Sequence, residues 1–131
     1  MNGSMIDMQH KQKVQFDWTI KQHDHQINIF GPMGIALAQI ESSDNNNLIT
    51  IQNTHYSLDD YSTIYLGSTL VPADFLQLIR TPELFRKIHH HMQIQKVNRR
   101  CALGVNLPHK IAFSINKNHF IIVIKSYEKI A

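Results

Sequence analysis

Cysteine and long apolar runs are scarce in this sequence, and each absence excludes a class of protein. Cys101 is the only cysteine among the 131 residues, so no disulfide can form within the chain. The longest apolar run spans residues 120–124, whereas a membrane-spanning helix needs about 20 apolar residues. The opening stretch MNGSMIDMQHKQ has no apolar core of the kind found in signal peptides. A disulfide-stapled scaffold and a helical membrane protein are therefore excluded.

Charged residues are also few. They make up 18% of the sequence against 43% hydrophobic residues, which is the composition of a globular protein. The net charge is +3, and the basic pair Arg99-Arg100 is too short to form a nucleic-acid patch. We expect one domain over residues 1–131, a solvated basic surface and no nucleic-acid partner.

Catalytic and metal-binding motifs are missing from the sequence. It has no phosphate-binding glycine loop, no GxSxG and no HExxH. The run His89-His90-His91 is the densest histidine cluster, but three consecutive helical positions point in different directions and cannot ligate one metal. His23 and His25 have no evident third ligand. We therefore expect a protein without enzymatic activity, cofactor or bound metal.

The first third of the sequence has the period of β-strands. Apolar and polar residues alternate over 14–20, which places Val14, Phe16, Trp18 and Ile20 on one face. Further strands are predicted in the same region, over 4–8, 26–30, 35–40 and 48–52.

Helical patterns follow in the middle of the chain. Ser57 with Asp60 three residues later is typical of a capping box. A second helix is predicted to begin near Pro72. A third is predicted to begin at Thr81-Pro82 and to extend to Met92.

Two more strands are predicted near the end, over 110–115 and 119–124, whereas 92–103 has no clear pattern. The fold class is therefore α+β, a curved antiparallel sheet with helices packed on one face. Such a sheet can enclose an apolar ligand site. The candidate lining residues are large and apolar: Phe16, Trp18, Ile27, Ile29, Leu37, Ile40, Phe75 and Ile79. The alternative is that the same side chains fill a solid core.

The stretch INIFGPMGIAL contains an unusual turn. Gly31, Pro32 and Gly34 suit a turn, because glycine permits positive φ and proline fixes φ. Met33 does not, since turn tips face water. Two outcomes are open: the methionine protrudes, or it folds back onto the sheet.

Six short motifs occur in a set order along most of the chain. They are KVQFDW (13–18), IFGPMG (29–34), YSLDD (56–60), LVPADFL (70–76), LPHKI (107–111) and FIIVIK (120–125). Each is weakly specific alone. Together and in this order they resemble the LolB family, outer-membrane receptors that take lipoproteins from a periplasmic carrier and insert them into the membrane.

The resemblance implies an unclosed antiparallel β-barrel with helices that cap an apolar cavity for acyl chains. It places Met33 at the family's protruding turn leucine and makes Gly31-Pro32-Met33-Gly34 the candidate insertion turn. The implied partners are acylated lipoproteins, a LolA-like periplasmic carrier and the membrane surface. The implied location is the periplasmic face of the outer membrane. The alternative is a protein-interaction or envelope-assembly module with the same fold and a filled core.

The sequence departs from the family in two places. It has no signal peptide, acylated N-terminal cysteine or leading helix, for which trimming of the chain is the simplest explanation. The stretch between Arg86 and Leu107 is shorter than in the family, which has another strand hairpin there. A barrel with fewer strands has open edges, and such edges are usually covered or paired with another chain. A dimer through these edges is therefore a further possibility.

Overall fold

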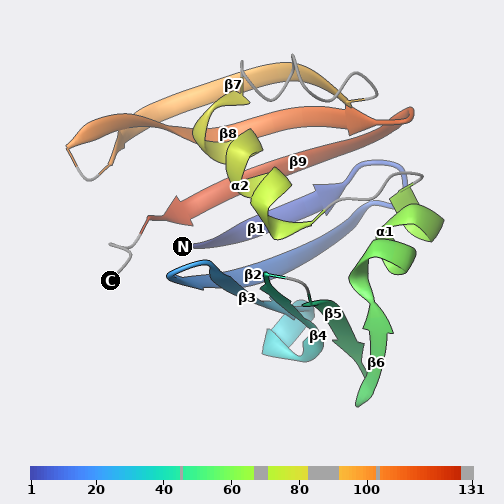
Figure 1. The fold of residues 1–131 in the computed structure, drawn as a ribbon. Coiled ribbons are helices and arrows are strands. Elements are labelled where there is room, and N and C mark those ends of the chain that lie inside the picture. Colours follow the sequence, from blue (N-terminus) through green and yellow to red (C-terminus); the bar gives the residue numbers. More distant parts are fainter. Residues whose placement is uncertain (45, 67–70, 83–91, 103, 128–131) are drawn as a thin grey trace.

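The computed structural model of the chain describes residues 1–44, 46–66, 71–82, 92–102 and 104–127. Within these ranges, nine strands form one antiparallel sheet, and two α-helices lie against it (Figure 1). The strands are β1 (Asn2–Asp7), β2 (Gln12–Lys21), β3 (Asp24–Phe30), β4 (Ala36–Ser43), β5 (Asn46–Ile51), β6 (Thr54–Ser57), β7 (Met92–Ala102), β8 (Val105–Ile115) and β9 (Asn118–Ser126). The helices are α1 (Leu58–Leu66) and α2 (Pro72–Arg80), and one 3₁₀ turn, η1 (Pro32–Gly34), joins β3 to β4. None of the described helices is long and apolar enough to cross a membrane.

The order of the strands joins the two ends of the chain. The order is β6-β5-β4-β3-β2-β1-β9-β8-β7, so the first strand pairs with the last. Strands β6 and β7 lie at the two edges, and among the described strands the sheet does not close. The predicted α+β class with an unclosed antiparallel sheet is therefore confirmed at this level.

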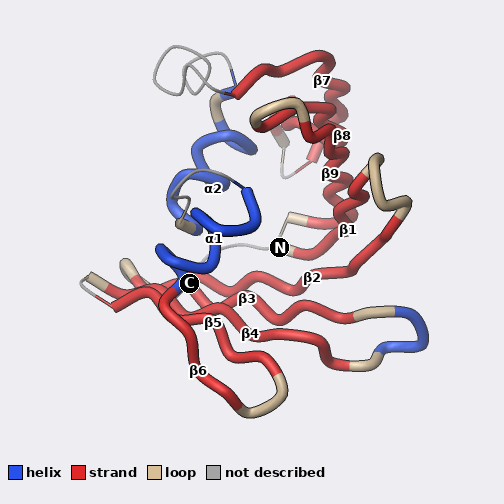
Figure 2. Tube along the Cα trace, turned by 90° about the vertical axis from the view of Figure 1, so that its right-hand side faces the viewer, coloured by secondary structure: helices blue, strands red, loops and turns tan. Residues whose placement is uncertain are grey.

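Both helices lie on the concave side of the curved sheet (Figure 2). Helix α1 follows β6 directly, and the backbone N–H of Asp60 donates to the Ser57 hydroxyl over 3.4 Å, as the capping pattern predicts. Helix α2 begins at Pro72, and the Asp74 carboxylate accepts a hydrogen bond from the N–H of Val71 over 3.0 Å.

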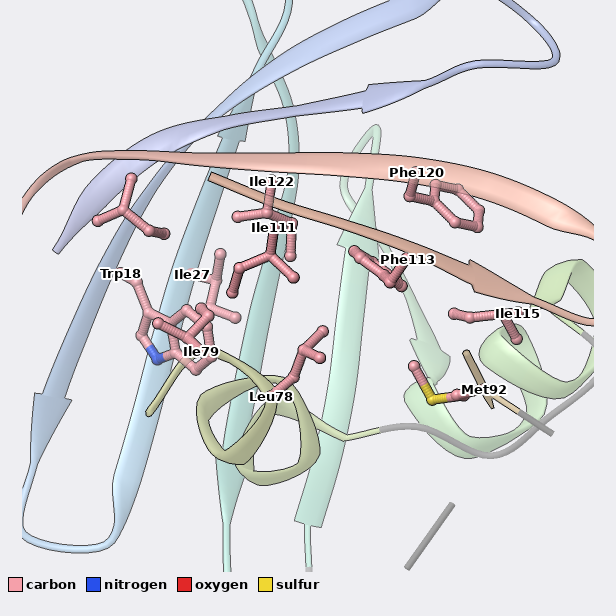
Figure 3. Close-up of a cluster of buried hydrophobic side chains, with 11 residues drawn as sticks. Trp18, Ile27, Leu78, Ile79, Met92, Ile111, Phe113, Ile115, Phe120 and Ile122 are labelled. Carbon is pink, nitrogen blue, oxygen red and sulfur yellow. The ribbon is translucent and has the colours of Figure 1, made fainter. Parts of the chain in front are cut away.

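The core lies between α2 and the inner face of the sheet. Leu78 and Ile79 of α2 are fully buried and point toward the strands (Figure 3). Under them the strands β8 and β9 contribute a closely packed set, in which the rings of Phe113 and Phe120 stack with centroids 5.5 Å apart. The rest of this set consists of the buried isoleucines Ile111, Ile115, Ile122 and Ile124.

Three regions differ from the sequence prediction or cannot be compared with it. Strand β6 forms where the sequence pattern predicted no strand, because its residues pair with β5. Met92 is not helical: it starts β7 and pairs with Ile115, which buries it. The remainder of the predicted third helix, with the His89-His90-His91 cluster, lies outside the described residues.

Gly3 is the position where the β1–β9 pairing tolerates no side chain. Its partners in the register are Phe16 and Ile124. A Cβ atom at Gly3 would lie 2.1 Å from the carbonyl oxygen of Val123 and 3.1 Å from the Phe16 ring. The Phe16 ring therefore fills the space that the missing side chain leaves.

We predict that Gly3→Ala destabilises the fold by about 1–3 kcal/mol or more, because the backbone of β9 must move to admit the methyl group. Urea denaturation measures the change. Gln15→Ala, an exposed change on the neighbouring strand, is the control and should stay within about 0.5 kcal/mol. Equal stability of Gly3→Ala and the unmodified protein would show that β1 and β9 are not packed so closely.

Candidate functional site: an apolar pocket under α2

An apolar pocket lies between α2 and the concave face of the sheet. Its volume is about 110 Å³. The lining consists of apolar side chains alone, from β1 to β4, β9 and α2: Met5, Val14, Phe16, Trp18, Ile27, Ile29, Ile40, Phe75, Ile79 and Ile122. Such a site excludes ionic or hydrogen-bonding ligand groups and favours hydrocarbon.

The register of the sheet brings the strand residues together. Trp18 is directly opposite Ile27, and Ile27 is directly opposite Ile40, so the three side chains form one row across β2, β3 and β4. Phe16 and Ile29 form the next row. The period of two in β2 therefore aims Val14, Phe16 and Trp18, which share one face of the strand, into the pocket.

Helix α2 supplies the opposite wall. Phe75 and Ile79 are four residues apart and share one face of the helix. Ile79 is buried, whereas Phe75 remains half-buried at the pocket. Because the helix closes the pocket from one side only, its position sets how wide the pocket is.

Seven of the eight residues proposed from the sequence line this pocket. The prediction for Leu37 is wrong. Leu37 and Ile40 are three residues apart on β4, and side chains alternate along a strand, so the two cannot share a face without a bulge to shift the register. The bulge between β3 and β4 falls at Leu37 itself and leaves it on the outside. Its side chain covers Gly31 and is 44% exposed.

Three lining residues were missed in the sequence: Met5, Val14 and Ile122. Val14 belongs to the same alternation as Phe16 and Trp18, so the period of β2 carried the signal for it. Met5 and Ile122 meet only because β1 pairs with β9, and this pairing joins residues more than 100 positions apart. No local pattern indicates it.

One hydrogen bond fixes the orientation of Trp18. The indole N–H donates to Nδ1 of His25 over 3.1 Å, and the two ring centroids are 5.8 Å apart. Since the indole can only donate, Nδ1 must accept, and His25 is neutral with its proton on Nε2. Burial is the main cause that lowers the pKa of His25 below 6.5; the charge of Arg80 lowers it further, and Asp24 opposes the shift.

The turn at η1 carries the most exposed apolar side chain of the described residues. Met33 is 98% exposed, so it protrudes and does not fold back. Met33 follows Pro32 and has a φ of +63°. The backbone N–H of Gly34 donates to the carbonyl of Gly31, as in a type II turn. Glycine is preferred at this position, so the methionine side chain is held there against a backbone cost of roughly 1–2 kcal/mol.

A metal centre is absent from the described residues. Among them, no three histidine, cysteine, aspartate or glutamate side chains lie together in a way that would hold a metal ion. Neither a protein-family model nor a curated protein matches this chain. The pocket and the exposed turn are therefore the features from which a function has to be argued.

We predict that the stability of the fold decreases as the pH falls below about 6.5, in part through His25. The folded protein keeps His25 neutral, so as the pH falls the unfolded chain takes up a proton at a higher pH than the folded protein does. Protonation therefore favours the unfolded state, and the loss of stability is complete below the lowered pKa of His25 in the folded protein. Urea denaturation at pH 8 and pH 5 measures the difference. His25→Asn keeps an acceptor for the Trp18 indole without titrating and should show a smaller loss. An equal loss in both proteins would contradict this role of His25.

Proposed function

We propose that this protein is a non-enzymatic acyl-chain-binding protein that acts in the reception of lipoproteins and their insertion into the outer membrane. The observation that carries the proposal is the pocket beneath α2, whose ten lining residues are all apolar. Apolar surface of this kind gains about 25 cal/mol per Å² when a hydrocarbon chain replaces water. No polar group in the lining would orient a sugar, nucleotide or peptide.

The volume of the pocket limits the length of hydrocarbon chain that fits without a movement of α2. A dry cavity of roughly 150 Å³ holds a benzene molecule, so about 110 Å³ accommodates the end of one chain. A longer chain requires α2 to move away from the sheet. The half-buried Phe75 on this helix is the side chain that such a movement would displace first.

The exposed turn supports the membrane part of the proposal. An apolar side chain at a turn tip lowers solubility, but it can enter the interface of a bilayer or contact an acyl chain in transit. Methionine suits this task because it is flexible and polarisable. Ile35 and Leu37 extend the apolar surface at the same tip.

The motif resemblance to LolB supports the same function independently of the pocket. It adds a donor, a LolA-like periplasmic carrier, and a location at the periplasmic face of the outer membrane. On this reading the unclosed sheet with its two helices is a shortened LolB-like fold.

An interaction or assembly module remains the second candidate. The closely packed half of the core under β8 and β9 favours it, because Phe113, Phe120 and their neighbouring isoleucines are all buried there. The two candidates differ in whether a hydrocarbon chain enters the pocket, and binding measurements separate them.

We predict that a bromine-labelled medium-chain fatty acid quenches the fluorescence of Trp18, the only tryptophan. Binding should saturate, because the pocket is a single site. Ile40→Asn removes apolar surface from the wall and should weaken binding about tenfold, as expected from about 1.5 kcal/mol of lost burial. Leu37→Asn is the same kind of change on the same strand outside the pocket, and should bind normally. Quenching that does not saturate, or equal effects of the two variants, would favour the assembly module.

We predict that Met33→Glu keeps the fold and the fatty-acid binding but abolishes delivery to membranes, because a carboxylate at the tip is excluded from the bilayer. The assay loads a periplasmic carrier with a triacylated lipoprotein and follows its transfer to this protein and then to vesicles. Met33→Asn tests the same point without a charge, since asparagine tolerates positive φ. Normal delivery by a folded Met33→Glu protein would remove the role of the turn.

A further inference from the structure

A second exposed methionine lies at the same end of the sheet as Met33. Met8 follows β1 in the β1–β2 turn and is 49% exposed. The register ends at Asp7 and Gln12 in the β1–β2 hairpin and at Phe30 and Ala36 in the β3–β4 hairpin, so both turns leave the sheet at one end. In Figure 2 the β1–β2 turn and the short blue η1 segment project to the same side of the molecule.

The β8–β9 turn joins this end through two hydrogen bonds. The N–H of Met8 donates to the carbonyl of His119 over 2.9 Å, and the Gln9 side-chain amide donates to the carbonyl of Lys117 over 3.2 Å. These bonds hold Lys117 beside the turn that carries Met8. Three turns with two exposed methionines therefore form one end of the sheet.

This end is cationic. Lys11, Lys13 and Lys117 are all exposed there. Among the described residues of these turns, the one carboxylate is Asp7, which bonds Nδ1 of His10 over 2.7 Å and accepts from two backbone N–H groups. The three lysines are therefore available to pair with anionic groups outside the molecule.

At three of these turn residues the backbone has a positive φ, which is unfavourable for residues with a long side chain. Lys11, Met33 and Lys117 have φ of +53°, +63° and +75°. Glycine or asparagine adopts this left-handed region more cheaply. At each tip a long side chain is present where a small one would favour folding.

We propose that this end of the sheet, defined by Met8, Lys11, Lys13, Met33 and Lys117, binds a bilayer surface that carries anionic headgroups. The methionines enter the interface, and the lysines pair with phosphate groups beside them. Exposed apolar side chains framed by lysines are the combination that interfacial binding uses. A nucleic acid would use stacking platforms, and no phenylalanine, tyrosine or tryptophan occurs in these three turns. The proposal rests on the membrane contact proposed for Met33 and adds the class of lipid.

The test is sedimentation with two kinds of vesicle, phosphatidylcholine alone and phosphatidylcholine with about 30% phosphatidylglycerol as the anionic lipid. The unmodified protein should bind the anionic vesicles at least tenfold more tightly. The double variant Lys11→Glu/Lys117→Glu should lose most of this preference. Met8→Gln should weaken binding to both kinds of vesicle.

The matched control is Lys21→Glu/Lys125→Glu. These lysines are exposed at the opposite ends of β2 and β9, so the control changes the net charge equally. It should retain the preference for anionic vesicles. The proposal is overturned if the control loses as much as the test variant, since net charge alone would then explain binding, or if the unmodified protein shows no preference.

Fatty-acid quenching of Trp18, measured without vesicles, separates this proposal from the proposed function. Normal quenching without a vesicle preference overturns the anionic surface and leaves the pocket in place. Vesicle binding with the predicted variant effects but without quenching supports the surface and removes the acyl-chain function.

Discussion

The pairing of β1 with β9 is the interaction on which the rest of the structure depends. It joins the β1–β6 strands to the β7–β9 strands as one sheet. Without it, Met5 and Ile122 would not meet in the pocket, and the β8–β9 turn would not lie beside Met8. The close approach depends on Gly3, which leaves room for the backbone of β9 and for the Phe16 ring. One residue without a side chain therefore supports both the sheet and the pocket.

Helix α2 divides the space on the concave face into two unlike halves. Leu78 packs against the dense set under β8 and β9, whereas Phe75 and Ile79 border the pocket over β2 to β4. A dense half resists change, because interior packing has little free volume. The proposed function requires the pocket half to adapt to a ligand by a shift of the helix. The same short helix thus packs on the dense set on one side and borders the pocket on the other.

The strands of the first third and the lining on β2 and β3 follow from the sequence, because alternation fixes both the strand and its buried face. The start of α2 at Pro72 follows as well. The same alternation separates Leu37 from Ile40, three residues further along β4, so placing both in the pocket went against the period of the strand. The β1–β9 pairing was not predictable, since it joins residues at the two ends of the sequence. Strand β7 pairs with the next strand, β8, but two irregularities in the register interrupt its alternation. Met33 stands out in the sequence as an unusual turn residue, but its exposure and its positive φ come from the structure alone.

The most direct test of the central claim is methyl NMR of the isoleucine residues during titration with a fatty acid. The account predicts that methyl signals of Ile27, Ile29 and Ile79 shift and show contacts to the hydrocarbon chain. Those of Ile111 and Ile115, in the dense half of the core, should stay in place. Absence of any contact between the chain and the pocket methyl groups, in a folded protein, would contradict the claim that the space under α2 is an acyl-chain site.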